Sequence, residues 1–306
     1  MTLLDRAIVR LLPAVPKPVV QRFSSPYIAG STLHDAVETV RRLNAAGKLA
    51  TIDVLGEEIA REEDALAIAQ AYRDVFAAIE AHALDANVSV KLTGLGLELS
   101  YELCRENLED VLRVAAAQRN FVRIDMEDSS TTDDTLRLYR ELRAAGHDNV
   151  GVVLQAYLKR TLDDVRALAD LRPNVRLCKG IYVEPASLAF ADGEVVRANY
   201  LRCLEALLDA GCYVGVATHD EWLIGQSLLR ISERGLAPDG YELQMLLGVR
   251  EERASALVAE GHRLRVYVPF GEQWYAYSLR RLQENPAMAG TIARATAGRV
   301  LRLGRS

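Results

Sequence analysis

The residues with the clearest chemical potential lie near the end of the chain, in the stretch YAYSLRRLQENP, residues 275–286. At helical spacing Tyr277, Arg280, Arg281 and Glu284 share one face, which would carry an aromatic ring, two guanidinium groups and a carboxylate. Adjacent guanidinium groups can hold a carboxylate by bidentate hydrogen bonds. The simpler interpretation is a solvated helix with one Arg280–Glu284 ion pair, so the rest of the sequence must decide.

Composition narrows the class of protein. The chain has 306 residues, half of them hydrophobic, and a net charge of −5. This acidic balance is unsuited to general binding of nucleic acid, so we expect small-molecule partners. No apolar run near the N-terminus is long enough for a secretion signal or a membrane span, which favours a cytoplasmic location. The four cysteines show no CxxC spacing and the five histidines are scattered, so we predict no metal site.

The elements that must position any site are predicted from eight short apolar segments, typical of β-strands: 50–55, 88–92, 121–125, 150–155, 175–180, 213–218, 241–246 and 264–269. Amphipathic stretches separate nearly all of them, which indicates repeated βα units. An open doubly wound sheet would carry GxGxxG after its first strand, and GLGLEL at 94–99 lacks the third glycine. We therefore predict an α/β fold: a (β/α)8 TIM-type barrel over residues 46–306, a helical N-terminal arm over 1–45, and a C-terminal helix that closes the active site.

Polar residues gather at the C-terminal ends of the predicted strands, where barrels of this kind build their sites. They are Asp53, Lys91, Asp125, Gln155, Arg176, Lys179, Thr218, His219, Gln244 and Tyr267. Buried charges must pair with one another or with a charged ligand. Asp53, Arg123 and Arg265, taken singly, are most simply structural partners of neighbouring charges. The number of cations at one end of the barrel favours an anionic ligand.

The chain resembles the proline dehydrogenase family in eight segments, which occur in the family's order and with similar spacing: KLTGLGLELS, RIDMEDSS, VVLQAYLKRT, RLCKGIYVEP, VATHD, LQMLLGV, VYVPFG and YSLRRLQEN. The resemblance spans about residues 45–290 and is closest to the monofunctional bacterial enzyme. It implies noncovalently bound FAD and oxidation of L-proline to Δ1-pyrroline-5-carboxylate, the first step of proline catabolism. We expect a quinone as electron acceptor, although the sequence leaves the physiological acceptor open. We also expect a separate pyrroline-5-carboxylate dehydrogenase downstream, because no segment resembles the second dehydrogenase domain of the bifunctional relatives.

The resemblance implies how the substrate would be held. Arg280 and Arg281 would clamp the proline carboxylate, with Lys91 as a third cation. An apolar wall beside the pyrrolidine ring would be formed by Tyr267, Tyr277 and Leu246.

The resemblance also implies the catalytic and cofactor residues. Asp125 would be an active-site carboxylate that orders the pocket, and Arg176 would lie beside flavin N5, which accepts the substrate hydride. Cofactor contacts are implied for Met126, Gln155, Arg176, Lys179, Gly180, Ile181, Thr218, His219, Gln244 and Glu284. The connection 185–200 would cover the adenosine end. Where the family often has KGAY followed by Arg or Trp, this chain has KGIYVE, which puts the side-chain contacts of Ile181 and Val183 in question.

Two other functions stay open on the sequence alone. Lys91 or Lys179 at a strand end would suit a Schiff-base aldolase, which borohydride trapping would detect. A flavin-free barrel that binds an amino acid without turnover is the other alternative, and a yellow protein bleached by L-proline would exclude it. A peripheral contact with the inner membrane, where quinones reside, also stays open, as do the oligomeric state and the proton acceptor for the substrate amine.

Overall fold

Eight parallel strands close into a barrel in the order β1 to β8, with β8 hydrogen-bonded to β1. The structure is a computed structural model that describes residues 25–56, 59–275, 277 and 278. The strands are β1 Leu49–Val54, β2 Ala86–Val90, β3 Val122–Ile124, β4 Val150–Gln155, β5 Asn174–Cys178, β6 Tyr213–Ala217, β7 Tyr241–Leu246 and β8 Leu264–Phe270. The predicted (β/α)8 architecture is confirmed, and every strand end lies within two residues of its predicted position.

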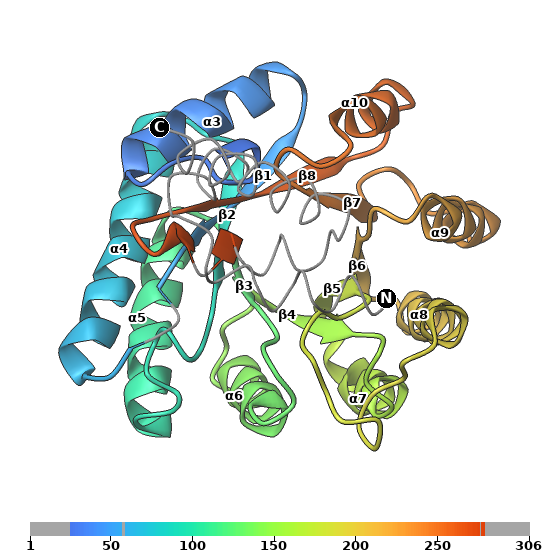
Figure 1. Cartoon of the computed structure of the whole chain (residues 1–306), viewed down its shortest axis with the longest axis horizontal. Helices are drawn as coiled ribbons and strands as arrows, with labels where there is room; N and C mark the ends of the chain where they lie inside the picture. Colours follow the sequence, from blue (N-terminus) through green and yellow to red (C-terminus); the bar gives the residue numbers. More distant parts are fainter. Residues whose placement is uncertain (1–24, 57–58, 276, 279–306) are drawn as a thin grey trace, which may run out of the picture.

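Helices form a ring around the strands (Figure 1). They are α3 Leu33–Ala45, α4 Glu62–Ala81, α5 Tyr101–Ala117, α6 Thr132–Ala144, α7 Thr161–Leu168, α8 Gly193–Asp209, α9 Glu221–Glu233 and α10 Glu251–Ala259, with short 3-10 turns η2 Ser25–Tyr27 and η3 Ala169–Leu171. None of the helices in the described residues combines the length and the apolar character that crossing a membrane requires.

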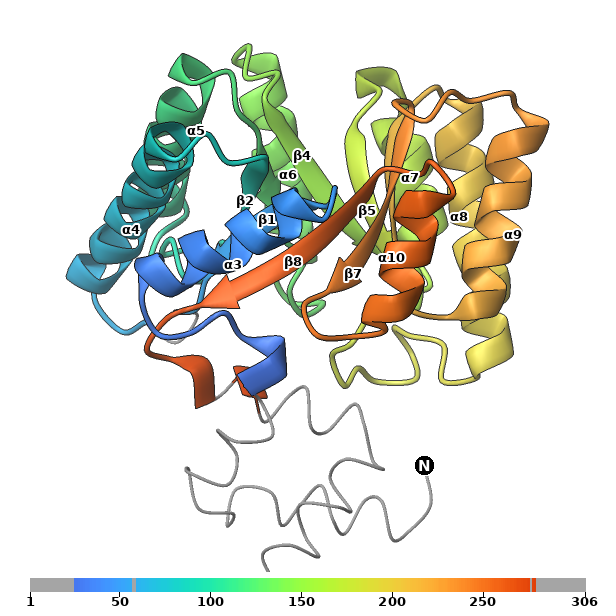
Figure 2. The ribbon, with the colours of Figure 1, turned by 90° about the horizontal axis from the view of Figure 1, so that it is seen from above.

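Helix α3 precedes the first strand yet packs on the outside of β8 and β1 (Figure 2). It begins at Leu33 because Thr32 and Asp35 form a reciprocal capping box at its N-terminus. In a regular barrel this outer position belongs to the helix that follows β8. The helix of the predicted N-terminal arm therefore covers the barrel wall, whereas the domain boundary at residue 45 stays a prediction.

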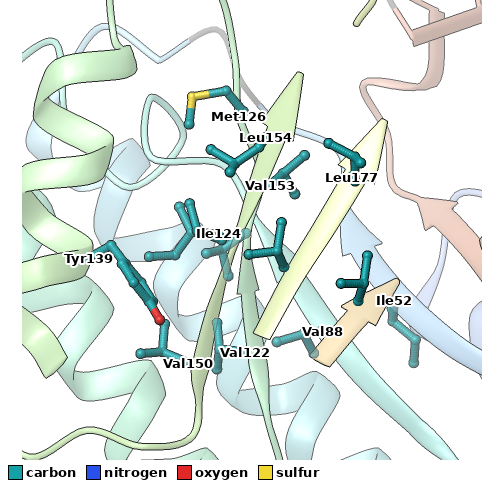
Figure 3. Close-up of a cluster of buried hydrophobic side chains, with 14 of the residues drawn as sticks. Ile52, Val88, Val122, Ile124, Met126, Tyr139, Val150, Val153, Leu154 and Leu177 are labelled. Atoms are coloured by element: carbon teal, nitrogen blue, oxygen red, sulfur yellow. The ribbon is translucent and has the colours of Figure 1, made fainter. Parts of the chain in front are cut away.

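The hydrophobic core lies mainly between the strands and the helices. Figure 3 shows part of it, with Tyr139 of α6 turned toward the strands that carry Val122 and Val150. All three side chains are at most 1% exposed. Burial of each such valine contributes about 1.5–3 kcal/mol, so the outer face of the barrel supplies much of the stability. The inner face is then free to carry polar groups.

The inner face is polar and crowded, and two strand glycines make room for its side chains. A Cβ atom on Gly215 of β6 would lie 2.4 Å from Nε2 of Gln244, and one on Gly151 of β4 would lie 2.5 Å from Nη1 of Arg123. Real Cβ atoms do not approach other atoms this closely, so any larger residue would displace the polar groups.

Candidate active site

Asp125 lies at the centre of the barrel mouth, directly after β3. Its Oδ1 accepts a hydrogen bond from Nη1 of Arg176 on β5 at 2.7 Å. Its Oδ2 accepts one from the hydroxyl of Tyr267 on β8 at 2.9 Å. Because β3 and β8 are not neighbours in the barrel, the second contact must cross the interior. Three residues predicted for the site are thus brought into direct contact.

Lys91, directly after β2, joins the same group. Its ammonium donates to Oδ1 of Asp53 at 2.9 Å and to the Tyr267 hydroxyl at 3.1 Å, and lies 3.6 Å from Oδ2 of Asp125. Asp53 is fully buried, so this ion pair satisfies a carboxylate that would otherwise be costly to bury. The expectation that Asp53 is a structural partner is confirmed. We call Asp53, Lys91, Asp125, Arg176 and Tyr267 the central network.

Tyr267 connects the two halves of the central network. Burial of its hydroxyl raises the pKa of Tyr267 well above the ordinary value, and the charges of Asp125 and Asp53 raise it further. The hydroxyl therefore stays protonated at physiological pH and donates a hydrogen bond to Asp125. The guanidinium of Arg176 lies 5.3 Å from the ring centroid and the ammonium of Lys91 lies 5.8 Å from it, so the ring also contacts both cations.

Arg176 is held from a second side by β7. Its Nε donates to Oε1 of Gln244 at 2.5 Å, and Nε2 of Gln244 donates to Glu242. Glu242 in turn accepts from Nε of Arg265 at 2.8 Å, which confirms that Arg265 is a structural partner. In the part of the chain that the structure describes, Nη2 of Arg176 makes no hydrogen bond. The guanidinium is thus fixed on two edges and retains donors for a ligand.

The interior carries charges of both signs. Over the described strands and the residues that follow them, its cations include Lys91, Arg123, Arg176 and Arg265. Its carboxylates include Asp53, Asp125, Glu127 and Glu242. Arg123 donates to the neutral oxygens of Val152 and Asn174, so within the described residues the prediction that it pairs with a neighbouring charge is wrong. Burial lowers the pKa of Arg123, and nearby Arg176 lowers it further, as expected for a cation without a paired carboxylate.

A second group of charges lies where strands five and six end. Oδ2 of Asp220 accepts from Nζ of Lys179 at 3.0 Å and from Nε of Arg197 at 2.8 Å. Although burial alone would raise it, these hydrogen bonds lower the pKa of Asp220 to about 2. Asp220 also caps α9 by accepting from the backbone N–H of Leu223. Two cations thus converge on one carboxylate, next to the predicted cofactor residues Thr218 and His219.

The loop after β5 is packed tightly on one side. Gly180 has φ +107°, and a Cβ atom there would lie 2.1 Å from the ring of Tyr157. Farther along, Glu184 accepts from the backbone N–H and the hydroxyl of Ser129, at 2.7 Å and 2.5 Å. Ile181 is exposed, so its side chain makes little contact within the chain. The predicted cover over 185–200 is shorter than expected, because α8 already begins at Gly193.

Other predicted cofactor residues also lie at strand ends. Nε2 of His219 accepts from the backbone N–H of Leu246 at 3.0 Å, which in a neutral ring leaves the proton on Nδ1. Thr218 accepts from the backbone N–H of Asp220. Nε2 of Gln155 donates to the carbonyl of Glu127 at 2.7 Å. These positions match the predicted strand ends, and the cofactor roles stay predictions.

The remaining predicted residues are Met126, Tyr277 and the three charged residues of the closing helix. Met126 is 6% exposed and belongs to the core cluster, at the upper edge of the group in Figure 3. Tyr277 packs with Ile28, Leu55 and Trp274, which is a contact that the sequence did not indicate. Arg280, Arg281 and Glu284 lie outside the described residues.

A pocket of about 440 Å³ lies among the loops that follow the strands. It is lined by residues of the loops after β1, β2, β3 and β5, namely Ile59, Ala60, Thr93, Glu98, Glu127, Asp128 and Tyr182. Thr93 and Glu127 also bond to each other, and each comes two residues after a member of the network. None of these lining residues was predicted from the sequence, because residues of these types are common in loops.

Comparison with known proteins identifies the family. The sequence model described as proline dehydrogenase matches residues 36–294. The chain belongs to the proline dehydrogenase family. Proline dehydrogenase 1 of Bacillus subtilis (strain 168) is 41% identical over 266 residues, which cover 87% of this chain and 88% of that protein. The proline dehydrogenase of Deinococcus radiodurans is 37% identical over 270 residues, which cover 87% of each chain.

Longer relatives contain the same barrel. The bifunctional protein PutA of Escherichia coli (strain K12) is 27% identical, and the match covers 95% of this chain and 26% of that protein. The crystal structure of proline utilization A from Bdellovibrio bacteriovorus, inactivated by N-propargylglycine, has a TM-score of 0.81 at 25% identity. That match covers 87% of this chain and 33% of the other, so this proline dehydrogenase spans about a third of it.

Family membership confirms the resemblance and decides between the functions left open by the sequence. The proline dehydrogenases are oxidoreductases that act in proline oxidation, so neither an aldolase nor a binding protein without turnover fits. The structure agrees with this outcome. Lys91 is ion-paired with Asp53 and Lys179 with Asp220, and neither is the free amine that a Schiff base requires.

Proposed function

We propose that this proline dehydrogenase oxidises L-proline to Δ1-pyrroline-5-carboxylate with noncovalently bound FAD and passes the electrons to a quinone. The observation that carries the proposal is the central network, in which Arg176, Tyr267 and Lys91 from three different strand ends converge on Asp125 at the barrel mouth. FAD, when bound, supplies the acceptor for the hydride that leaves the substrate. The chain's own residues must therefore bind the substrate, orient it and exclude water.

Substrate binding is assigned to the cationic side of the network. Lys91 presents an ammonium whose position is fixed by Asp53 and Tyr267, so little side-chain entropy is lost when it binds a carboxylate. Arg280 and Arg281 complete the clamp in this proposal. In this proposal the ring of Tyr267 forms one wall beside the pyrrolidine, and Tyr277 and Leu246 are assigned to the same wall.

The catalytic roles are assigned to Asp125 and Arg176. Arg176 is a permanent cation with donors left for a ligand, and it would stabilise negative charge that develops on the flavin. Asp125 holds Arg176 and Tyr267 in place and gives the site a carboxylate next to the substrate amine.

The residues that follow strands β4, β5 and β6 have charged and hydrogen-bonding groups of the kinds that can bind FAD. Lys179 and Arg197 converge on Asp220 and can turn further donors to a pyrophosphate. Gly180 gives the loop after β5 a left-handed backbone packed against the Tyr157 ring, which fixes the course of the loop beside Lys179. Gln155, Thr218 and His219 supply hydrogen-bonding groups at neighbouring strand ends. We assign Met126, Ile181, Gln244 and Glu284 to the same cofactor, with Gln244 acting through Arg176.

Anaerobic titration with L-proline tests the proposal. The purified protein is expected to be yellow and to lose the absorption of oxidised flavin when L-proline is added. Glycine, which has the carboxylate and the amine without the ring, is the control and should leave the spectrum unchanged. A colourless protein, or a flavin that stays oxidised in excess L-proline, would reject the proposal.

The quinone is tested in a second step. A soluble quinone analogue should reoxidise the bleached protein without oxygen, at a rate that supports turnover. Pyrroline-5-carboxylate should then accumulate in solution for a separate dehydrogenase. Comparison of rates with and without lipid vesicles tests the peripheral membrane contact, since a contact that aids quinone access would raise the rate.

A further inference from the structure

Glu242 is an ionised side chain deep in the barrel to which the proposed function gives no role. It lies on β7, two residues before Gln244 on the same inner face, and is 2% exposed. One carboxylate oxygen accepts from Nε of Arg265 and from Nε2 of Gln244, and the other accepts from the Tyr213 hydroxyl at 3.2 Å. Glu242 therefore accepts in each of these hydrogen bonds.

The amide of Gln244 is fixed by this arrangement. Nε of Arg176 can only donate, so it requires the amide oxygen. The carboxylate of Glu242 can only accept, so it requires the amide nitrogen. A reversed amide would place donor against donor and acceptor against acceptor. Gln244 thus has one favourable orientation, and that orientation depends on Glu242.

Strand β6, which pairs with β7, leaves space for the Gln244 amide. A Cβ atom on Gly215 would lie 2.4 Å from Nε2 and 2.8 Å from Cδ of Gln244. Register pairs Gly215 with Glu242 on one side and with Arg176 on the other, so the glycine lies between the two ends of the hydrogen-bonded chain. Any side chain at this position would displace the amide from both partners.

We propose that Glu242 is a positioning residue for the reaction: it orients Gln244, which holds the Nε edge of Arg176 and so keeps the opposite edge against Asp125. The inference rests on the proposed function, because the guanidinium is assigned there to face the flavin. Nη1 of Arg176 lies 2.7 Å from Oδ1 of Asp125, and loss of the Gln244 contact would leave this single bond to hold the group. Supporting partners of this kind typically change activity by about 10- to 100-fold when removed.

The test uses the flavin-loaded full chain and two ways to disturb Gln244. Glu242→Leu with Arg265→Met removes the acceptor together with its paired cation, so no lone charge stays buried. Gly215→Ala displaces the amide without changing any charge. Both variants should lower kcat by about 10- to 100-fold with little change in KM. Both should also make the midpoint potential of the bound flavin more negative, because a mobile cation stabilises the reduced ring less.

Two controls separate positioning from stability. Glu242→Gln keeps the acceptor oxygen and should retain kcat and the flavin potential, although loss of the buried charge beside Arg265 should lower its melting temperature. Gly225→Ala lies on α9 where nothing is within 4 Å of the added methyl group, and should behave as the unmodified protein. A crystal structure of Gly215→Ala should show a longer distance from Arg176 Nη1 to Asp125 Oδ1.

Three outcomes would overturn the inference. The first is that the double variant and Gly215→Ala bind flavin and keep both kcat and the potential of the unmodified protein. The second is that Glu242→Gln loses as much activity as the double variant, which would assign the effect to charge alone. The third is an unchanged position of Arg176 in the variant crystal. Failure of the proposed function is distinct, because then the unmodified protein itself would not be reduced by L-proline.

Discussion

At the scale of single residues, the charged groups of the barrel mouth act through one another. Asp125 accepts from Arg176 and Tyr267, and Lys91 contacts both Tyr267 and Asp53. None of these groups is held by one contact alone. A substitution in the central network is therefore expected to change stability, and a substitution of a residue assigned to the substrate is expected to change substrate binding as well, so the design of a variant must separate the two effects.

Lys91→Met tests this coupling. Loss of the ammonium removes a charged contact to the proline carboxylate worth about 1.5–3 kcal/mol, so KM should rise by roughly 10- to 100-fold. It also leaves the fully buried Asp53 without its ion pair, which should lower the free energy of unfolding by about 3–5 kcal/mol. Steady-state kinetics and urea unfolding measure the two effects.

Asp53→Asn is the matched control for Lys91→Met. It weakens the same ion pair but keeps the ammonium, which Tyr267 and Asp125 still hold. Its stability should fall while its KM changes little. If Lys91→Met had the KM of the unmodified protein, Lys91 would contribute only to stability, and its assigned contact with the proline carboxylate would be wrong.

At the scale of elements, the loops after β5 and β6 decide cofactor binding. Gly180 lies in the left-handed region at φ +107° and against the Tyr157 ring. Gly180→Ala should cost about 1–2 kcal/mol in backbone strain, in addition to the clash, and should give protein with reduced flavin content. Gly193→Ala, at the start of α8 where nothing is within 4 Å, is the control and should be purified with full flavin content. Equal flavin content in both would show that this loop is not part of the site.

Asp220 makes the stability of the folded chain depend on pH. Its pKa is about 2 in the folded chain and about 3.9 in an unfolded one, so its stabilising effect is complete above pH 4 and is lost as the pH falls toward 2. At pH 7 Asp220→Asn should therefore be less stable by about 2 kcal/mol. The difference should shrink toward zero near pH 2, as measured by denaturant unfolding across this range. A difference that is independent of pH would contradict the assigned ion pairs with Lys179 and Arg197.

The elements themselves were largely predictable from sequence, and their contacts across the barrel were not. Short apolar segments that alternate with amphipathic stretches predicted the position of every strand, because the hydrophobic core between strands and helices requires that pattern. The contact between Tyr267 and Asp125 joins residues 142 apart and depends on barrel closure, which no local pattern specifies. Glu242 could have been found, since a period of two places it on the inner face with Gln244. The pairing of Asp220 with Arg197, 23 residues earlier, could not.

At the scale of the whole molecule, the fold places hydrophobic stability outside the barrel and charge inside it. The outer layer is apolar, whereas the interior holds charged groups of both signs. Donors that remain in the interior, such as Nη2 of Arg176, can bind a ligand. The bound cofactor and substrate are therefore expected to contribute to the stability of the folded chain.

Removal of flavin tests this expectation. With free FAD at about 100 times its dissociation constant, the folded state gains about 2.7 kcal/mol, which for a chain of 306 residues corresponds to an increase in melting temperature of roughly 4 °C. FMN lacks the adenosine part and cannot reach the cations around Asp220 in the same way, so it should give a smaller increase. Thermal unfolding of the stripped protein with each flavin measures this, and equal effects would place the adenosine part outside the loops after β5 and β6.

A crystal structure of the dithionite-reduced protein with L-proline tests the central claim most directly. The account predicts the proline carboxylate within hydrogen-bond distance of Lys91 Nζ, the pyrrolidine ring against Tyr267, and the flavin on the side of Arg176. Proline bound elsewhere, or a barrel mouth filled only by solvent while the ligand is bound, would contradict it.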